Sequence, residues 1–258
     1  MEIKNLIVFP DIHGRDFWKQ YINSLSQEEI QQTLFVFLGD YMDPYEYENI
    51  SEAEAFANFK DIINFKKEHM DNVILLIGNH DCSYLYSKDI CSSRYCYSIL
   101  RELIAFYKEN LNLFQLAYEI KYNNKRYVFS HAGIHDKFLG LLKVYGIDDN
   151  PDNIVTTLNN LYTESMQNYE MRNNTELARL LSTYSRFRGL SPYDFGSCVW
   201  ADIREFYVLY KTKDTQPQIQ YQVFGHTQLK DSPIIEDTFA CLDCRKTFKI
   251  ENDTIIEA

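Results

Sequence analysis

The stretch Phe37-Leu-Gly-Asp-Tyr-Met-Asp-Pro44 places two carboxylates, Asp40 and Asp43, directly after an apolar run. That run, Leu34-Phe-Val-Phe-Leu38, is short, aromatic and β-branched and ends at a glycine, which predicts a buried strand. An ionised carboxylate at the end of such a strand must be hydrated, paired or bound to a metal, because burying an isolated charge is costly. The stretch therefore predicts a polar site at the end of a buried strand.

Polar side chains also follow other predicted strands. In layered α/β proteins, the loops at the carboxyl ends of strands converge on one crevice, where ligands bind. We therefore expect five metal-capable side chains to meet there: Asp11, Asp40, Asn79, His131 and His226. In the extended segment Asp11-Ile-His13, residues i and i+2 point to the same side, so His13 can reach the same ion as Asp11.

The histidines are distributed unevenly. Four of the six lie in glycine-containing turns after strands: His13, His80, His131 and His226. A single histidine in a turn is most often a solvated residue or a local capping partner. Four such turns, together with the carboxylates and Asn79, favour one shared site.

Strand and helix patterns alternate early in the chain and give way to short strands at its end. Strands are predicted at 3–9, 33–38 and 73–77, and a helix at 95–109. A hairpin is predicted over 116–129 and a mostly helical stretch over 152–187. This order favours an α/β (α+β) fold, either a mixed sheet or a two-sheet sandwich with helices outside. No repeat or flexible linker divides the chain, so one domain over residues 1–258 is expected.

The formal net charge of -11 argues against a general nucleic-acid or anionic-membrane surface, which needs a basic patch. A phosphorylated substrate held by metals remains compatible, because a metal site sets its own local charge. No run approaches the roughly 20 apolar residues of a membrane span, and the N-terminal segment has no signal-peptide pattern. We therefore expect a cytoplasmic protein whose six cysteines are free thiols.

Five short motifs occur in one order along the chain: Asp11-Ile-His-Gly, Gly39-Asp-Tyr-Met-Asp, Gly78-Asn-His-Asp, Ser130-His-Ala-Gly and Gly225-His-Thr. In these motifs the chain resembles the calcineurin-like metallophosphoesterases, nearest to their phosphoprotein phosphatase and diadenosine tetraphosphatase branch. The resemblance runs from residue 11 to residue 227. It implies a two-sheet mixed β-sandwich flanked by helices, with a helical insertion around 152–190 that would either cap the metal cleft or cover the core.

The resemblance also implies two divalent metal ions. The first would be held by Asp11, His13 and Asp40, and the second by Asp40, Asn79, His131 and His226. Nitrogen and oxygen ligands without thiolate suit Mn, Fe, Zn, Co or Ni better than Ca, and manganese is expected to support activity in vitro. Two dications less the carboxylates of Asp11 and Asp40 leave a positive centre that matches a phosphoryl dianion.

The chemistry implied is direct attack on phosphorus by a metal-bridging hydroxide, without a covalent phosphoenzyme. In this scheme His80 protonates the leaving oxygen as general acid. Asp43 orients His80 by accepting a hydrogen bond from its other ring nitrogen. A turn-capping role is the structural alternative for Asp43.

One departure from the family pattern concerns the grip on phosphate. Pro44-Tyr45 stand where the phosphatase branch usually has Arg-Gly after the second aspartate, and that arginine normally holds the substrate phosphate. Other arginines are candidates for its role: Arg15, Arg94, Arg186, Arg188 and Arg204. Arg94 leads, because the branch carries polar substrate contacts shortly after its Asn-His motif, and Arg15 lies beside the first motif.

The resulting prediction is a metal-dependent hydrolase of phosphomonoesters, acting on phosphoprotein Ser/Thr or on a small phosphorylated metabolite. One alternative is a dinucleoside polyphosphate (Ap4A-type) or cyclic nucleotide phosphodiesterase. A third is a catalytically inactive metal-binding scaffold, for which the missing Arg-Gly is the support. No stable nucleic-acid partner and no membrane are expected, and the sequence leaves the oligomeric state open.

Overall fold

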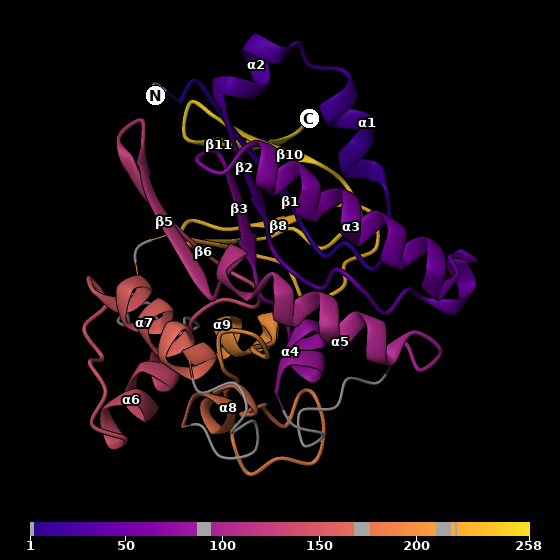
Figure 1. Cartoon of the computed structure of the whole chain (residues 1–258). Coiled ribbons are helices and arrows are strands. Elements are labelled where there is room, and N and C mark those ends of the chain that lie inside the picture. The colour runs from indigo at the N-terminus through magenta and orange to yellow at the C-terminus, as the bar shows by residue number, and fades with distance from the viewer. Residues whose placement is uncertain (1–2, 87–93, 168–175, 210–217, 220) are drawn as a thin grey trace.

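The computed structural model describes residues 3–86, 94–167, 176–209, 218–219 and 221–258. Two β-sheets form its centre, with helices around them (Figure 1). Eleven strands are described in these ranges: β1 (Asn5–Phe9), β2 (Thr33–Phe37), β3 (Val73–Leu76), β4 (Phe114–Gln115), β5 (Ala117–Tyr122), β6 (Lys125–Ser130), β7 (Gln222–Phe224), β8 (Ile234–Ile235), β9 (Phe239–Cys241), β10 (Phe248–Glu251) and β11 (Thr254–Glu257).

The first sheet has the order β11-β10-β1-β2-β3-β4. Its strands β1 to β4 are parallel, with Phe9 opposite Phe37 and Phe37 opposite Leu75, while β10 and β11 are antiparallel at one edge. The second sheet has the order β5-β6-β7-β9-β8, in which β6, β7 and β9 are parallel. Both sheets are therefore mixed, as the sequence predicts.

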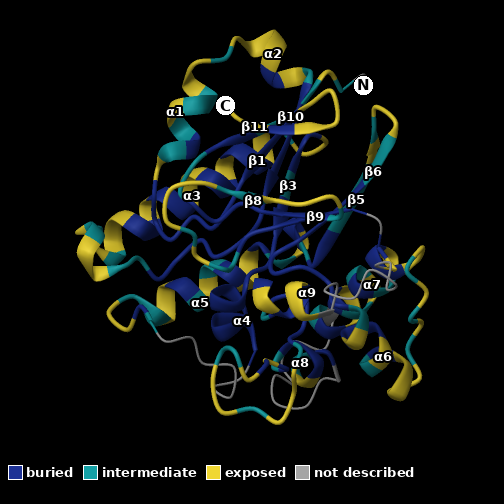
Figure 2. Ribbon diagram, turned by 180° about the vertical axis from the view of Figure 1, so that it is seen from behind, coloured by how far each residue is buried: buried dark blue, intermediate teal, exposed yellow. Residues whose placement is uncertain are grey.

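Side chains alternate across the first sheet because successive residues of a strand point to opposite faces. Leu6 and Val8 pack toward the second sheet, where Phe129 and Val223 belong to the same buried cluster. Residues on the other face pack against helices, and both faces of the central strands are covered (Figure 2). This double burial explains why the strands read as continuous apolar runs.

Nine α-helices lie in the described ranges: α1 (Phe17–Asn23), α2 (Gln27–Gln31), α3 (Glu52–Glu68), α4 (Asn79–Leu85), α5 (Leu100–Glu109), α6 (Asp136–Val144), α7 (Ile154–Gln167), α8 (Glu176–Leu181) and α9 (Ile203–Leu209). Of two 3₁₀ turns, η1 (Glu46–Glu48) lies between β2 and α3, and η2 (Leu111–Leu113) lies between α5 and β4. Helix α3 begins at a capping box in which Ser51 and Glu54 exchange hydrogen bonds, as expected for this spacing. Helix α9 covers the outer face of the second sheet, where Phe206 packs on Phe224.

The arrangement of the strands decides where the polar loops meet. Strands β1, β2 and β3 run in parallel, so the loops after them leave the same edge of the first sheet. Strands β6 and β7 are parallel in the second sheet, so the loops after them also share an edge. Figure 1 shows α4, α5, α8 and α9 at the end of the molecule away from the two termini.

The expected helices agree with the structure in part. The helix expected over 95–109 begins only at Leu100. The stretch 152–187 contains α7 and α8, while residues 168–175 lie outside the described residues. Asn159 of α7 bonds the backbone of Leu116 and Ala117, so α7 covers the core beside β5. The short elements α2, α4, α6, α9, β4 and β11 were not predicted from the sequence, because none is long enough to show a clear period.

The five cysteines in the described ranges are free and buried, whereas Cys91 lies outside them. Among the helices of the described residues, none has the length and apolarity needed to cross a bilayer.

Candidate metal centre

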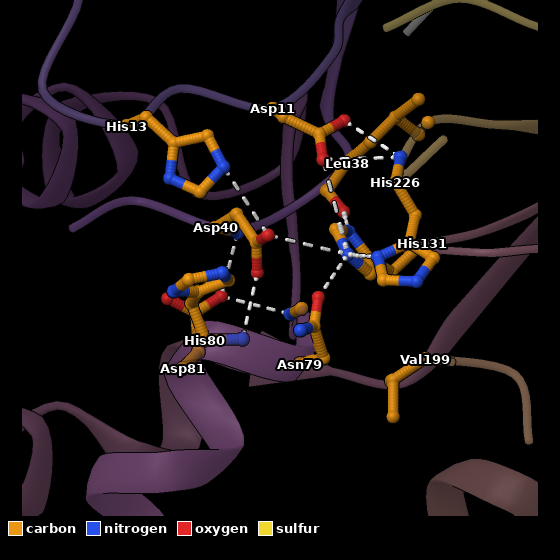
Figure 3. A network of polar contacts seen from close by, with 12 residues as sticks. Asp11, His13, Leu38, Asp40, Asn79, His80, Asp81, His131, Val199 and His226 are labelled. Carbon is orange, nitrogen blue, oxygen red and sulfur yellow. Dashed lines mark hydrogen bonds and ion pairs between the residues drawn. The ribbon is translucent and has the colours of Figure 1, made fainter. Parts of the chain in front are cut away.

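The structure brings the side chains predicted from the five motifs into one cluster. Two groups of three residues each offer one ligand atom, with these atoms within 4.8 Å of one another. The groups are His13, Asp40 and His80, and Asp40, His131 and His226. Asp40 belongs to both, and Figure 3 shows its carboxylate between His13 on one side and His131 on the other.

The side chain of Asp40 lies between the two groups. Its Oδ2 lies 3.5 Å from Nε2 of His13 and 3.5 Å from Nε2 of His131. Its Oδ1 accepts a hydrogen bond from the backbone N–H of His80 at 2.9 Å. One carboxylate oxygen thus faces two imidazole nitrogens on opposite sides, while the backbone fixes the other oxygen.

The second group gathers further ligand-capable atoms. Nε2 of His131 lies 3.0 Å from Oδ1 of Asn79 and 3.2 Å from Nδ1 of His226. Asp11 Oδ1 lies 3.9 Å from the same His131 nitrogen. Both carboxylate oxygens of Asp11 accept from the backbone N–H of His226, at 2.9 and 3.0 Å.

The imidazole rings are held by their other nitrogens. Nδ1 of His13 lies 2.8 Å from the carbonyl oxygen of Met42, and Nδ1 of His131 lies 2.8 Å from that of Leu38. A backbone carbonyl can only accept, so each Nδ1 carries the proton and each Nε2 keeps its lone pair toward the cluster. Burial lowers the pKa of His13 and of His226 well below the ordinary value, so both rings are neutral near pH 7.

Several buried carboxylates lie close together in the cluster, and a bound cation would offset their negative charge. Burial raises the pKa of Asp40 well above its ordinary value, and the nearby Asp11 and Asp81 raise it further. Neutral imidazoles and a buried carboxylate crowded by other carboxylates form a donor set that a divalent cation satisfies. The residues present therefore fit the two metal ions that the motifs imply.

Two glycines make room for these carboxylates. A Cβ on Gly78 would lie 2.1 Å from Asp40 Oδ1, and a Cβ on Gly225 would lie 2.0 Å from Asp11 Oδ2. These glycines precede Asn79 and His226 in sequence, so each of these two predicted ligands follows a glycine that leaves space for a carboxylate of another motif. Four of the nine non-glycine residues with positive φ in the described ranges belong to the predicted motifs: His13, Asp40, Asp43 and His226 have φ of 44°, 55°, 62° and 64°.

The predicted pair of His80 and Asp43 is formed. Nδ1 of His80 lies 2.6 Å from Oδ2 of Asp43. The hydroxyl of Tyr84, from the same helix as His80, donates to Oδ1 of Asp43 in a short hydrogen bond. The ring of His80 stands almost perpendicular to that of His13, with centroids 4.9 Å apart. Asp43 thus orients His80 within the group that also contains His13 and Asp40.

Asp81 is a site residue whose role was missed in the sequence. Its Oδ2 accepts from the backbone N–H of Asp40 and of Gly78, both at 2.8 Å. Its Oδ1 accepts from the N–H of Tyr41 at 3.1 Å and the hydroxyl of Tyr107 at 2.6 Å. Asp81 therefore ties the loop that carries Asp40 to the start of α4, and its place three residues after Gly78 was the available signal for a helix cap.

The predicted arginines lie in different surroundings. Nη2 of Arg94 is 3.4 Å from Nε2 of His13, and its Nε donates to the carbonyl oxygen of Asp43 at 3.0 Å. Arg15 is buried, with Nε bonded to both carboxylate oxygens of Glu48 at 2.9 and 3.0 Å and Nη1 bonded to the carbonyl oxygen of Asp11. Arg94 therefore reaches the cluster itself, while Arg15 braces the loop behind it.

On the opposite side of the cluster, Trp200 and Arg188 lie beside His226. The rings of Trp200 and His226 are nearly perpendicular, with centroids 5.6 Å apart. Nη2 of Arg188 donates to Thr227 Oγ1 at 2.8 Å, and its Nε pairs with Asp202 Oδ2 at 3.0 Å. The segment from Cys198 to Asp202 therefore borders the cluster.

Comparison with known proteins agrees with this geometry. The sequence model of the calcineurin-like phosphoesterase family matches residues 4–229. A cold-active protein-tyrosine phosphatase from a psychrophilic Shewanella species has a TM-score of 0.59 at 16% identity, covering 99% of this chain and 77% of that one. A protein serine/threonine phosphatase from Saccharomyces cerevisiae has a TM-score of 0.50 at 15% identity, covering 98% of this chain and 78% of that one. At these identities the likeness concerns the fold, and comparison with curated proteins finds no match.

The matched region begins before Asp11 and ends after His226, so it contains all five motifs. The two-sheet architecture agrees with that of the structural neighbours. The chain therefore belongs to the calcineurin-like phosphoesterase family.

Proposed function

We propose that this protein hydrolyses phosphomonoesters with the help of two divalent cations. The observation that carries the proposal is Asp40 shared between two groups of ligand-capable side chains, one of which contains His80, the partner of Asp43. Asp11, His13 and Asp40 would hold one cation, and Asp40, Asn79, His131 and His226 the other. Bound there, the cations would polarise the phosphoryl oxygens and lower the pKa of a shared water.

His80 has the role of general acid in this proposal. It donates a proton to the leaving oxygen, and Asp43 holds its ring so that Nε2 faces the substrate while Nδ1 is engaged at 2.6 Å. Tyr84 supports this arrangement from the other oxygen of Asp43. Asp43 therefore acts through His80 and not on the substrate directly.

Arg94 is proposed to bind the substrate phosphate. Its guanidinium lies within 3.4 Å of a nitrogen in the first ligand group, and a guanidinium can donate two parallel hydrogen bonds to phosphate oxygens. Arg15 is the weaker of the two predicted arginines for this role, because Glu48 and the Asp11 carbonyl already engage its donors. We propose that Arg15 fixes the Asp11 loop.

A substrate panel under added Mn, Zn, Fe, Co, Ni and Mg tests the proposed function. It would contain p-nitrophenyl phosphate, a phosphoserine peptide, a phosphotyrosine peptide, a phosphodiester, a cyclic nucleotide and a dinucleoside tetraphosphate. The phosphopeptides are included because the structural neighbours are described as tyrosine and serine/threonine phosphatases. We expect metal-stimulated turnover of a monoester, with manganese effective.

Each alternative has its own outcome in this panel. Preferred turnover of the dinucleoside tetraphosphate or of a cyclic nucleotide would replace the monoester proposal by a phosphodiesterase or pyrophosphohydrolase. Two bound metals without turnover of any substrate would favour a scaffold.

A further inference from the structure

Arg94 reaches the metal centre from a distant part of the sequence, and Tyr45 contacts it there. The Cζ atom of Arg94 lies 3.5 Å from the centroid of the Tyr45 ring, so the guanidinium rests on the face of the ring. Nε of Arg94 donates to the carbonyl oxygen of Asp43, the residue directly before Pro44-Tyr45. The guanidinium therefore occupies the space beside the segment where the related phosphatases carry their phosphate-binding arginine.

The Tyr45 ring is itself held on several sides. It stands almost perpendicular to the ring of His13, with ring centroids 5.1 Å apart and an interplanar angle of 80°. Tyr47 lies 5.2 Å away, and the guanidinium carbon of Arg15 lies 5.4 Å from the Tyr45 centroid. Because Arg15 is fixed by Glu48, the ring has little room to turn. Proline at position 44 further restricts the backbone that leads to the ring.

We propose that Tyr45 is a positioning residue whose ring holds Arg94 toward a phosphate bound at the metal centre. In this arrangement Tyr45 and Arg94 together do what a single arginine after Asp43 does in related phosphatases. The inference rests on the proposed function, because it concerns how the proposed phosphatase binds the phosphate group of its substrate. It accounts for two departures at once: loss of the arginine at position 44 and gain of a bulky ring where glycine is usual.

The contacts set the expected size of the effect. An arginine on the face of an aromatic ring is stabilised enough that losing the ring weakens its preferred position by about tenfold. Removing the ring should therefore act on phosphate binding and leave the metals in place, because Tyr45 contributes no ligand atom. Removing Arg94 should have a larger effect on the same quantity.

The test measures binding of inorganic phosphate to the Mn-loaded full chain by calorimetry, together with kcat and KM for p-nitrophenyl phosphate. We expect Tyr45→Leu to raise the phosphate Kd and the KM about tenfold, with a smaller change in kcat and unchanged metal content. Tyr45→Phe keeps the face of the ring, so its phosphate Kd and KM should stay within about threefold of the wild-type values. Tyr145→Leu, an exposed tyrosine at the end of α6, is the matched surface control.

Two further variants separate positioning from general damage. In an Arg94→Ala background, Tyr45→Leu should have no further effect on phosphate Kd, because the ring then has nothing to hold. Pro44→Arg combined with Tyr45→Gly should restore phosphate binding to Arg94→Ala, because it returns the arginine to its usual place in the sequence.

An unchanged phosphate Kd in Tyr45→Leu would overturn the inference, as would an equal loss of phosphate affinity from Tyr45→Leu with and without Arg94. If wild type still hydrolyses a monoester, either result leaves the proposed function intact. A metal-loaded wild type that neither binds phosphate nor hydrolyses any monoester would overturn the proposed function instead.

Discussion

Asp43 binds His80 and Tyr84 through different oxygens of one carboxylate: Oδ2 lies 2.6 Å from His80 Nδ1, and Oδ1 accepts from the Tyr84 hydroxyl. Both partners belong to α4, while Asp43 belongs to the loop after β2. The carboxylate therefore locks the loop and the helix together and fixes the imidazole at the same time. Its two roles can be separated by mutation.

Replacing the proposed acid should depend on the leaving group. We expect His80→Asn to lower kcat about 10²- to 10⁴-fold for an alkyl phosphate, whose leaving oxygen needs a proton. The loss should be less than about tenfold for p-nitrophenyl phosphate, because its leaving phenolate is stable without one. Steady-state kinetics with both substrates, and metal content by mass spectrometry, measure this. Undiminished activity on the alkyl phosphate would contradict the role of His80.

Substitution of Asp43 should lower kcat more than substitution of Tyr84. Asp43→Asn is expected to lower kcat about 10- to 100-fold at unchanged metal content, because it disturbs the group that orients the acid. Tyr84→Phe removes the donor to Oδ1 and the acceptor of the Cys96 backbone N–H but leaves the contact between Asp43 and His80, and we expect less than a tenfold loss. The measurement is kcat for an alkyl phosphate in both variants. If Tyr84→Phe were as damaging as Asp43→Asn, the hydroxyl would need a larger role than support.

The sequence predicted the first three strands and the polar side chains that follow them because both depend on local patterns. Apolar runs that end at Pro10, Gly39 and Gly78 predicted β1, β2 and β3, and the polar turns after them contain residues that now lie together at Asp40. The family resemblance added the division of these residues between two metal ions. Sequence patterns thus sufficed for the parts of the site that are encoded within a few residues.

Contacts between distant loops were not predictable in the same way. Asp81 bonds the backbone at Asp40 across 41 positions, and Tyr84 bonds Asp43 across the same separation. Arg94 was favoured from its place after the third motif, but nothing local indicated that Tyr45 would support its guanidinium. Helix α4 has seven residues, too few for an amphipathic period, and so its capping by Asp81 was missed.

A glycine substitution tests whether the Asp40 carboxylate needs the space that Gly78 leaves for it. We expect Gly78→Ala to lower metal affinity about 10- to 100-fold, because the added Cβ would meet Asp40 Oδ1 at 2.1 Å and displace it. Gly78 has φ of −96°, which alanine adopts readily, but its Cβ would also lie 2.6 Å from the backbone nitrogen of Asp40. Metal titration with a chromophoric chelator measures the change.

The matched control for this prediction is Gly140→Ala in α6, where an added Cβ meets nothing within 4 Å. That change should leave metal affinity unaltered and stabilise the helix by roughly 0.5–1 kcal/mol. Equal metal affinity in Gly78→Ala and Gly140→Ala would mean that the carboxylate of Asp40 is not a ligand.

Removal of bound metal should lower the thermal stability of the protein. A cation that binds only the folded chain stabilises it by about 2.7 kcal/mol at a concentration 100 times its Kd. We therefore expect a chelator to lower the Tm of wild type and added Mn to restore it. Asp40→Asn, which alters the residue shared by both groups, should show little Mn-dependent change in Tm. A full Mn response in Asp40→Asn would argue against Asp40 as the common ligand.

His135 should make the folded state sensitive to acid independently of the metal centre. Its ring is buried, packs against Phe195 and Phe206, and accepts from the backbone N–H of Lys137 at the start of α6. Burial lowers the pKa of His135 to about 4, from an ordinary value of 6.5. The unfolded chain therefore binds a proton between these values that the folded chain does not.

The sign follows from that difference. The contribution of neutral His135 is fully present above pH 6.5 and is lost progressively as the pH falls toward about 4. The loss amounts to about 3 kcal/mol in the free energy of unfolding once the pH is below both values.

Asparagine at position 135 is the suitable comparison, because it can still cap the helix but does not titrate. We expect His135→Asn to be less stable than wild type near pH 7.5, where it lacks the ring packing, and to lose less stability on acidification. Urea unfolding of both chelator-treated proteins at several pH values from 7.5 to 4.5 measures this, and the difference between them cancels the other titrating groups. Parallel curves would show that His135 titrates alike in the folded and unfolded chain, and the buried ring would then have no part in acid sensitivity.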